Sequence, residues 1–411
     1  MSRKVTAMLI GVLGVSLAAH AEPFAYVTNR DSNTVSVIDT ATNAVNATVN
    51  VGDVPFDVAI TPDGAFAYVV NGGSNTVSVI STVSNTVIAT VNVADFPRGV
   101  AITSDGAFAY VTNALSDTVS VIDTTSNTVS ATVIVGATPS DVAITPDGTF
   151  AYVVNGGSNT VSVISTVSNT VSATVNGVGP APRGIAITPN GAFAYVVNQN
   201  PGTVSVIDTA SNTVIATVDV GETPFGVAVT PDGAFAYVTN IDSSSVTVID
   251  TASNTVIATV SVPDEPLEVA ITPDGAFAYV AHFGPGIVSV IATADNTVIA
   301  TVSVGSAPVA VAITPPHGDS DADGVPDAFD QCPDTAVPES APTSGKLGQA
   351  RYALRSGVTF SMGPKAKIVY TMTDTAGCSC EQIAATLGLG RGHLKFGCSI
   401  GAMKAWIVGL P

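Results

Sequence analysis

The densest group of ionisable side chains in this sequence is a twelve-residue segment that begins at position 319. Five aspartates occupy its positions 1, 3, 5, 9 and 12, and a glycine occupies position 6: Asp319, Asp321, Asp323, Asp327, Asp330 and Gly324. Carboxylates this close together repel one another, and a hard cation that accepts several oxygen ligands relieves the repulsion. The spacing is typical of Ca²⁺ loops, in which the backbone carbonyl at position 7, here that of Val325, is a further ligand. The sequence therefore predicts that this loop binds one Ca²⁺.

The residues around the loop do not suit an EF-hand, which has a helix on each side and usually ends its loop with glutamate. Here two prolines and a histidine precede the loop, an aspartate ends it, and Cys332-Pro333 follows. In these features the segment resembles a thrombospondin type 3 repeat, present in a single copy. The resemblance implies a calcium-binding connector over residues 315–343.

Four cysteines form the second group of reactive side chains: Cys332, Cys378, Cys380 and Cys398. Three of them lie in residues 344–411, which we expect to form a small α+β module that needs crosslinks because its core is small. Four cysteines allow three pairings. We favour Cys398 bonded to Cys378 or Cys380, with the remaining cysteine bonded to Cys332. A zinc site formed by Cys378, Cys380, His393 and Cys398 is the alternative, and an oxidising compartment disfavours it.

A long repeat indicates the structure that carries these groups. A Phe-x-Tyr-Val unit returns at steps of 42, 42, 42, 43, 42 and 42 residues, with its tyrosine at Tyr26, Tyr68, Tyr110, Tyr152, Tyr195, Tyr237 and Tyr279. Each period holds four short runs rich in valine, isoleucine and threonine, separated by turn residues. Four strands in about 40 residues is the pattern of a β-propeller blade. Because the phenylalanine and tyrosine recur unchanged, we assign them to packing between blades.

Three copies of the repeat read Tyr-Val-Thr-Asn, at residues 26–29, 110–113 and 237–240. They resemble the YVTN family of β-propeller repeats, and the resemblance covers residues 24–314. The first copy lacks the Val-Ala-Ile-Thr strand that precedes the others, whereas residues 311–314 supply this strand at the end of the array. We therefore predict an all-β, seven-bladed propeller over residues 22–314, closed by a strand from its C-terminal end.

Two adjacent positions vary while the rest of the repeat stays nearly constant. They follow a recurring proline, at the start of each predicted inner strand. In a closed ring these strand starts meet at one mouth of the central channel, where aromatic, basic and acidic side chains would form a ligand site. The candidate residues are Phe56, Asp57, Arg98, Asp141, Arg183, Phe225 and Glu268. Sequence drift combined with ion pairing across the mouth is the alternative explanation.

Residues 1–21 have the features of a signal peptide, namely two basic residues, a short apolar stretch and Ala-His-Ala at the end. We expect export to the periplasm, the cell surface or the medium, with no transmembrane segment in the mature chain. Residues 22–316 contain 23 acidic and three basic side chains, a formal charge of −20. Some members of the YVTN family bind nucleic acid, but so acidic a region would repel phosphates. The expected partner is a protein or a surface glycan.

The repeat region has few groups suited to catalysis. It contains one histidine, His282, and neither cysteine nor lysine, and we expect His282 to be an ordinary loop residue. We assign no catalytic residue and expect an exported, calcium-binding propeller that acts as a binding, interaction or adhesion module. The alternative rests on fold analogy: an enzyme of the lactonase or quinone-dependent dehydrogenase type, with its active site in the funnel at the mouth of the channel.

Overall fold

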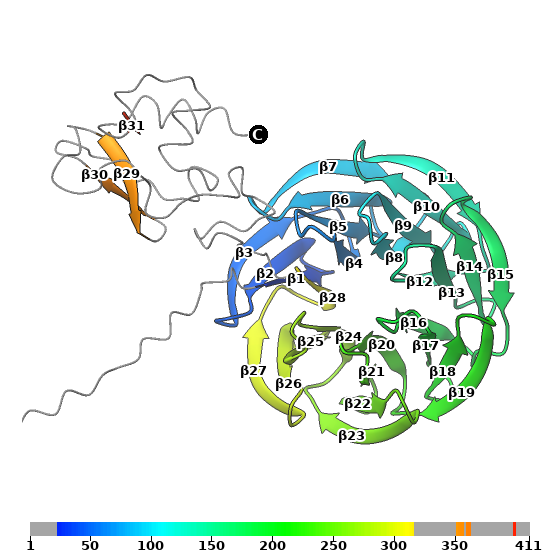
Figure 1. The fold of residues 1–411 in the computed structure, drawn as a ribbon. Coiled ribbons are helices and arrows are strands. Elements are labelled where there is room, and N and C mark those ends of the chain that lie inside the picture. The colour runs from blue at the N-terminus through cyan, green and yellow to red at the C-terminus, as the bar shows by residue number, and fades with distance from the viewer. Residues whose placement is uncertain (1–22, 316–350, 357–358, 363–397, 400–411) are drawn as a thin grey trace, which may run out of the picture. The chain divides into compact units, whose positions relative to one another are not determined.

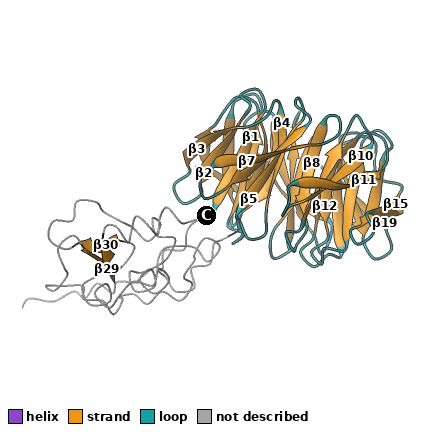
Figure 2. Cartoon of the chain, turned by 90° about the horizontal axis from the view of Figure 1, so that it is seen from above, coloured by secondary structure: helices purple, strands orange, loops and turns teal. Residues whose placement is uncertain are grey.

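A computed structural model describes residues 23–315, 351–356, 359–362 and 398–399. In residues 23–315, seven four-stranded antiparallel sheets stand around a central axis, as Figures 1 and 2 show. Each sheet runs from an inner strand beside the axis to an outer strand at the rim. This is the seven-bladed β-propeller that the repeat predicts. The described residues include no helix that is long and apolar enough to cross a membrane.

The strand bounds follow the period of the sequence. The inner strands each begin at the recurring proline: β4 (Pro55–Ile60), β8 (Pro97–Ile102), β12 (Pro139–Ile144), β16 (Pro182–Ile187), β20 (Pro224–Val229), β24 (Pro266–Ile271) and β28 (Pro308–Ile313). The second strands begin at the recurring phenylalanine: β1 (Phe24–Asn29), β5 (Phe66–Asn71), β9 (Phe108–Asn113), β13 (Phe150–Asn155), β17 (Phe193–Asn198), β21 (Phe235–Asn240) and β25 (Phe277–His282).

The two outer positions of each sheet are equally regular. The third strands are β2 (Thr34–Asp39), β6 (Thr76–Ser81), β10 (Thr118–Asp123), β14 (Thr160–Ser165), β18 (Thr203–Asp208), β22 (Ser245–Asp250) and β26 (Ile287–Ala292). The outer strands are β3 (Ala44–Asn50), β7 (Thr86–Asn92), β11 (Thr128–Ile134), β15 (Thr170–Val175), β19 (Thr213–Asp219), β23 (Thr255–Ser261) and β27 (Thr297–Ser303).

Strand β28 closes the ring by pairing with β1, so one blade combines both ends of the repeat array. Tyr26 lies opposite Ala312 in this pair. Just beyond it, the Phe24 amide donates to Thr314 Oγ1 at 2.9 Å, and the Thr314 amide donates to the Phe24 carbonyl at 2.9 Å. The predicted closure by a C-terminal strand is therefore confirmed.

The core of the propeller lies between neighbouring blades. All seven repeat tyrosines are at most 1% exposed, and Tyr26 packs with Val35 of its own blade and Val69 of the next. Each tyrosine hydroxyl donates to the side chain of a turn asparagine in the adjacent blade, as Tyr26 does to Asn85 at 2.7 Å. Asn85 has a φ of 51°, in the left-handed region that asparagine adopts more readily than most residues. Packing between blades explains the recurring tyrosine, as predicted.

Three further strands form a separate antiparallel sheet in the order β30-β29-β31: β29 (Arg351–Ser356), β30 (Thr359–Met362) and β31 (Cys398–Ser399). They lie in the predicted C-terminal module, whose expected helices fall outside the described residues. The predicted signal peptide and calcium loop also fall outside them, as do Cys332, Cys378, Cys380 and His393.

Candidate functional site

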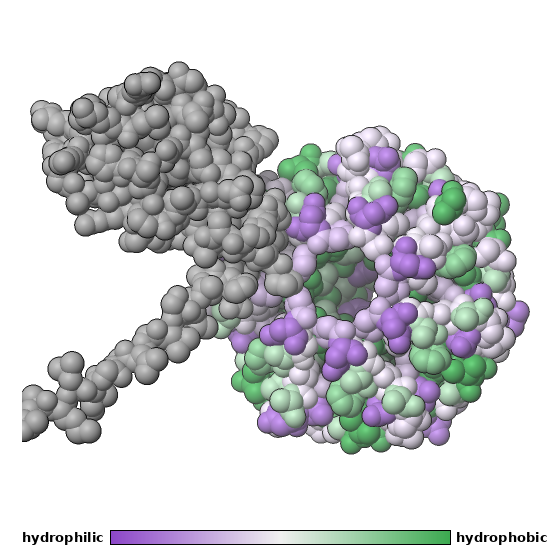
Figure 3. Space-filling view, in the orientation of Figure 1, coloured by the Kyte–Doolittle hydropathy of each residue, from purple (hydrophilic) through white to green (hydrophobic). Residues whose placement is uncertain are grey.

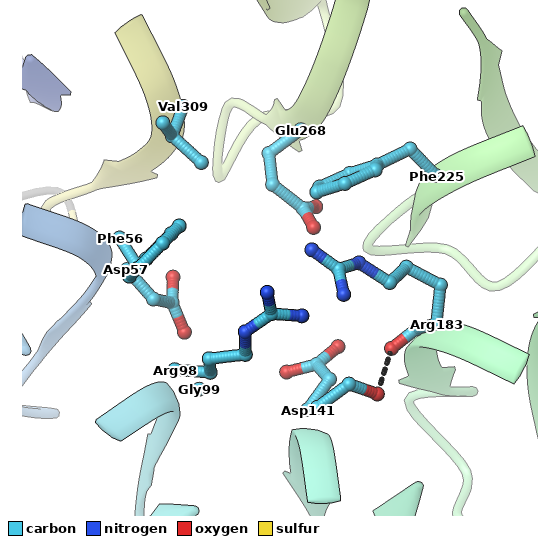
Figure 4. A pocket seen from close by; sticks show the side chains of 10 residues that line it. Phe56, Asp57, Arg98, Gly99, Asp141, Arg183, Phe225, Glu268 and Val309 are labelled. Carbon is cyan, nitrogen blue, oxygen red and sulfur yellow. Dashed lines mark hydrogen bonds between the residues drawn. The ribbon is translucent and has the colours of Figure 1, made fainter. Parts of the chain in front are cut away.

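All seven residues predicted for the mouth line one cavity, together with Gly99, Ser140 and Val309. Its volume is about 30 Å³, and its lining residues come from the starts of all seven inner strands. Figure 4 shows the side chains that converge there. Figure 3 shows the central opening of the ring, with hydrophilic residues around the rim and hydrophobic residues in its wall. The convergence that the sequence pattern predicts is therefore present.

A β-bulge at the start of the inner strand positions these side chains. The residue before each proline has positive φ, for example 58° at Val54 and 51° at Thr138. The pairing register with the second strand then shifts, between Pro55 and Asp57 on β4. Bulges of this kind re-aim a side chain out of the regular pleat. The same local structure recurs around the ring, while the side chains that it presents differ from blade to blade.

Two acids at the mouth connect the inner strands of neighbouring blades. Asp57 accepts the amide of Val58 at 2.7 Å and the amide of Val100, on β8, at 2.8 Å. Asp141 forms the same bridge to the amide of Ile185, on β16, at 2.9 Å. An inner strand has no further strand beside it, so its free N–H groups need such acceptors. These carboxyls are therefore held in place by the scaffold.

The acids require small residues on the adjacent inner strand. A Cβ atom added to Gly99 would lie 2.8 Å from the Asp141 Cα atom, closer than real Cβ contacts allow, and one at Gly226 would collide with the Glu268 carboxylate. The pattern is visible in the sequence two residues after each recurring proline, where no two acids are neighbours around the ring: Asp57, Gly99, Asp141, Gly184, Gly226, Glu268 and Ala310. This signal was not among the sequence-based predictions.

A second missed signal is the difference between the Tyr-Val-Thr-Asn and Tyr-Val-Val-Asn repeats. Thr112 Oγ1 accepts the amide of Gly99 at 2.8 Å, and Thr239 Oγ1 accepts the amide of Gly226 at 2.9 Å. Where an acid replaces the glycine, an apolar residue replaces the threonine: Val70, Val154 and Ala281. Each threonine thus faces a small residue at the bulge, although Gly184 lies against Val197 and has no threonine.

The arginines of the mouth lie over aromatic rings. The guanidinium carbon of Arg98 is 5.4 Å from the ring centre of Phe56 and 5.3 Å from that of Phe96. That of Arg183 is 4.6 Å from the ring centre of Phe225. Stacking of this kind fixes the plane of a guanidinium group and leaves its N–H edge available for an acceptor.

The acids and arginines of the mouth face one another without ion pairs. The single ion pair among the described residues joins Arg30 to Asp31, outside the cavity lining, at 3.9 Å. Ion pairing across the mouth, the alternative explanation offered by the sequence, is therefore not found within residues 23–315.

Burial changes the ionisation of these groups. It raises the pKa of the Asp57 carboxyl to about 8 and that of Asp141 to about 6. The pKa of Glu268 is also raised, by burial and by the charges of Asp141 and Asp57. Burial lowers the pKa of Arg183 to about 10. Near neutral pH the mouth consequently carries less negative charge than its three carboxyls would in water.

We expect the propeller to lose stability as the pH rises from about 5.5 to about 8.5. Folding raises the pKa of Asp57 from 3.8 to about 8, so the folded protein binds more protons, and this contribution is lost as the pH passes through the folded-state value. The loss of unfolding free energy between the two pH values should be about 1–3 kcal/mol smaller in Asp57→Asn than in the wild type. Thermal unfolding at both pH values checks the prediction, with the exposed Asp219→Asn as control. Parallel pH profiles for wild type and Asp57→Asn would contradict it.

His282 is not part of this site. It ends β25, is 0% exposed, and its Nδ1 lies 3.2 Å from the Asp264 carbonyl, so it is a buried strand residue rather than the loop residue that we expected. In another blade the aligned Asn240 accepts the amide of Gly221 at 3.0 Å. The residue aligned with Gly221 is here Pro263, which has no N–H to donate. Histidine thus replaces asparagine in the blade where proline occupies the position of Gly221.

The predicted metal ligands Asp319, Asp321, Asp323, Val325, Asp327 and Asp330 lie outside the described residues. Within the described ranges, no group of three or more histidine, cysteine, aspartate or glutamate side chains is arranged to hold a metal ion. The mouth of the channel is therefore the candidate site that the structure presents.

Comparisons with known proteins agree with the fold. The chain matches the family model described as "Lactonase, 7-bladed beta-propeller" over residues 17–135 and 89–216, and the model described as "Cytochrome D1 heme domain" over residues 192–312. No curated protein sequence matches the chain.

Two solved structures are also similar. Hydrazine synthase from Kuenenia stuttgartiensis has 26% sequence identity and a TM-score of 0.58, and the match covers 62% of this chain and 88% of that chain. A functionally unknown protein from Desulfotomaculum acetoxidans DSM 771 has 21% identity and a TM-score of 0.65, and the match covers 71% of this chain and 99% of that chain. The chain is thus a seven-bladed β-propeller with similarity to lactonase-type propellers.

Proposed function

We propose that this protein is an exported binding propeller whose ligand is a small molecule held at the mouth of the channel. The observation that carries the proposal is the composition of the cavity, where aromatic, acidic and basic side chains converge from strands that are otherwise nearly identical. Ligand pockets typically combine an apolar wall with a few convergent polar groups. The repeats supply the scaffold, and the variable positions supply recognition.

A thermal-shift screen of small molecules against the full chain tests this proposal. A ligand that binds only the folded state raises the melting temperature, so one chemical class should stabilise the wild type. The shift should vanish in the double variant Arg98→Val/Arg183→Val, because valine already occupies the aligned position at Val309. The exposed Asp219→Asn is the control and should respond as wild type does. A library without stabilising compounds, or a shift that persists in the double variant, would count against the proposal.

The proposal also includes the parts of the chain outside the propeller. Residues 1–21 direct export, and residues 319–330 bind Ca²⁺ in a connector between the propeller and the cysteine-containing module. Such a chain would present its propeller to a protein or glycan partner beyond the cytoplasmic membrane. The formal charge of −20 over residues 22–316 supports a partner other than nucleic acid.

We expect one Ca²⁺ to bind the full chain with a dissociation constant on the order of 10⁻⁴–10⁻³ M, which is typical of extracellular calcium modules. The double substitution Asp321→Asn/Asp323→Asn removes two charges at nearly constant shape and should abolish the heat of binding at millimolar Ca²⁺. Asp334→Asn, outside the twelve-residue loop, is the matched control. Calorimetry decides the matter: equal heats from wild type and the double variant would refute the assignment.

A hydrolytic enzyme is the second candidate. It is supported by the match to the lactonase model and by Asp57 and Asp141, whose pKa values of about 8 and about 6 suit proton exchange near neutral pH. The pKa of Glu268 beside them is also raised. Acid release from a panel of lactones measures such an activity. Turnover that disappears in Glu268→Gln and survives in Asp219→Asn would favour hydrolysis at the mouth. Because a binding protein does not convert its ligand, we expect none of the lactones to be hydrolysed.

A haem enzyme finds less support. The similarity to the cytochrome D1 haem domain and to hydrazine synthase suggests redox chemistry. Haem iron in proteins is held by histidine, cysteine, methionine or tyrosine. Residues 23–315 contain no cysteine or methionine, and their single histidine, His282, is fully buried away from the cavity. Their seven tyrosines are at most 1% exposed and bonded to asparagine, so the described propeller does not fit a haem.

A further inference from the structure

All three basic side chains of the propeller lie at or beside the mouth. Arg98 and Arg183 line the cavity, and the guanidinium carbon of Arg30 is 5.8 Å from the ring centre of Phe56, which lines it as well. The three charges influence one another. Besides burial, the charge of Arg30 lowers the pKa of Arg98, and the charge of Arg98 lowers that of Arg183. A region with a formal charge of −20 thus concentrates its positive charge in one place.

The donors of these arginines are not used within the described part of the chain. A guanidinium group has five N–H donors. None of the three guanidinium groups donates a hydrogen bond to another described residue, and the buried Nε atoms of Arg98 and Arg30 have no hydrogen-bond partner there. Buried polar atoms in native proteins nearly always have a partner, so these donors point to an acceptor from outside the propeller.

The aromatic contacts direct the free donors into the cavity. Phe56 and Phe96 hold one guanidinium group, and Phe225 holds the other. Figure 4 shows Arg98 and Arg183 reaching toward each other in the middle of the cavity. The carboxyls around them differ in this respect, because Asp57 and Asp141 already accept backbone amides. Two of the three acids are thus already bonded, whereas the guanidinium donors have no acceptor within residues 23–315.

We propose that the ligand carries a carboxylate or phosphate group, and that this group binds between Arg98 and Arg183. This inference rests on the ligand site of the proposed function. Guanidinium groups pair with both kinds of oxyanion through two parallel hydrogen bonds, which gives strength and orientation together. A cationic ligand would leave these donors without acceptors. The cavity volume of about 30 Å³ limits the enclosed part of the ligand to a small group such as the oxyanion itself.

The oxyanion should bind less tightly at alkaline pH. The charged groups that face it are Arg98 on β8, Arg183 on β16, Asp57 on β4, Asp141 on β12 and Glu268 on β24, with Arg30 beside them. Ionisation of Asp57 adds negative charge next to the ligand as the pH rises through about 8. A ligand group held by packing alone would not show this dependence.

Calorimetric titration of the full chain with inorganic phosphate, acetate and glucose tests the inference. We expect phosphate or acetate to bind and glucose not to bind. The comparison of phosphate with acetate shows whether the site takes a phosphate or a carboxylate group. Arg98→Gln and Arg183→Gln should each weaken binding about 10- to 100-fold, the effect of losing a charge-assisted hydrogen bond. Arg183→Lys, which keeps the charge, should recover part of the affinity. Arg351→Gln, outside the propeller, should leave it unchanged.

The outcomes separate this inference from the function on which it rests. Equal oxyanion affinity in wild type and both glutamine variants would overturn the inference, as would a wild type that binds neither oxyanion. The thermal-shift screen can still find a neutral or cationic ligand whose rise in melting temperature is lost in Arg98→Val/Arg183→Val. In that case the proposed function stands without the oxyanion. If that screen finds no ligand at all, the proposed function fails as well.

Discussion

Deletion of residues 308–314 is expected to lower the melting temperature of the propeller by more than about 10 °C. The segment contains β28, the inner strand of the blade that also holds β1, β2 and β3. Its loss exposes the edge of β1 and removes apolar groups such as Val309 and Ala310, which are 4% and 1% exposed. Open strand edges and lost core contacts each cost several kcal/mol, which corresponds to a shift of this size.

A matched deletion separates ring closure from chain shortening. Removal of seven residues at 335–341, in the predicted connector, should leave the melting temperature of the propeller nearly unchanged. Scanning calorimetry on both deletion variants gives the comparison. Equal melting temperatures for the 308–314 deletion and the wild type would show that the ring does not depend on its closing strand.

Tyr279→Ala is expected to destabilise the propeller by about 3–5 kcal/mol. Tyr279 is 0% exposed, and its hydroxyl donates to Asn43 Oδ1 at 2.6 Å, across the interface between the last blade and the closing blade. Tyr279→Phe keeps the ring and loses only the hydrogen bond, so it should cost about 1 kcal/mol. Chemical denaturation measures both, with Val167→Ala, at a position 90% exposed, as the control. Equal costs for Tyr279→Ala and Tyr279→Phe would mean that packing between blades contributes little.

The fold could be predicted from the sequence because one local pattern is copied seven times. The tyrosine, the turn asparagine and the inner-strand proline each recur with the period of the blade, so a single assignment serves all copies. The missing first strand at Phe24 and the surplus strand at 311–314 predicted the closure, since both follow from counting strands. Each of these inferences depends on chain order alone.

The mouth could be predicted in part. Variation after each recurring proline identified the residues that converge, but it could not show which polar groups are already bonded. That distinction depends on the bulge, which aims Asp57 at the amide of Val100, and on the close approach of inner strands that admits only glycine at Gly99. His282 was placed in a loop, whereas it ends β25 and its Nδ1 meets the Asp264 carbonyl in the segment before β24. Such effects require distances between segments far apart in the chain.

Modification of arginine with phenylglyoxal, read residue by residue by peptide mass spectrometry, tests most directly the claim that the mouth binds an oxyanion ligand. The partly exposed Arg98 and Arg183 should react in the free protein and become protected by phosphate or acetate, whichever binds in calorimetry. Arg351 and Arg355, which lie outside the propeller, should react to the same extent with and without the ligand. Equal modification of Arg98 and Arg183 in the presence and absence of saturating ligand would contradict the claim.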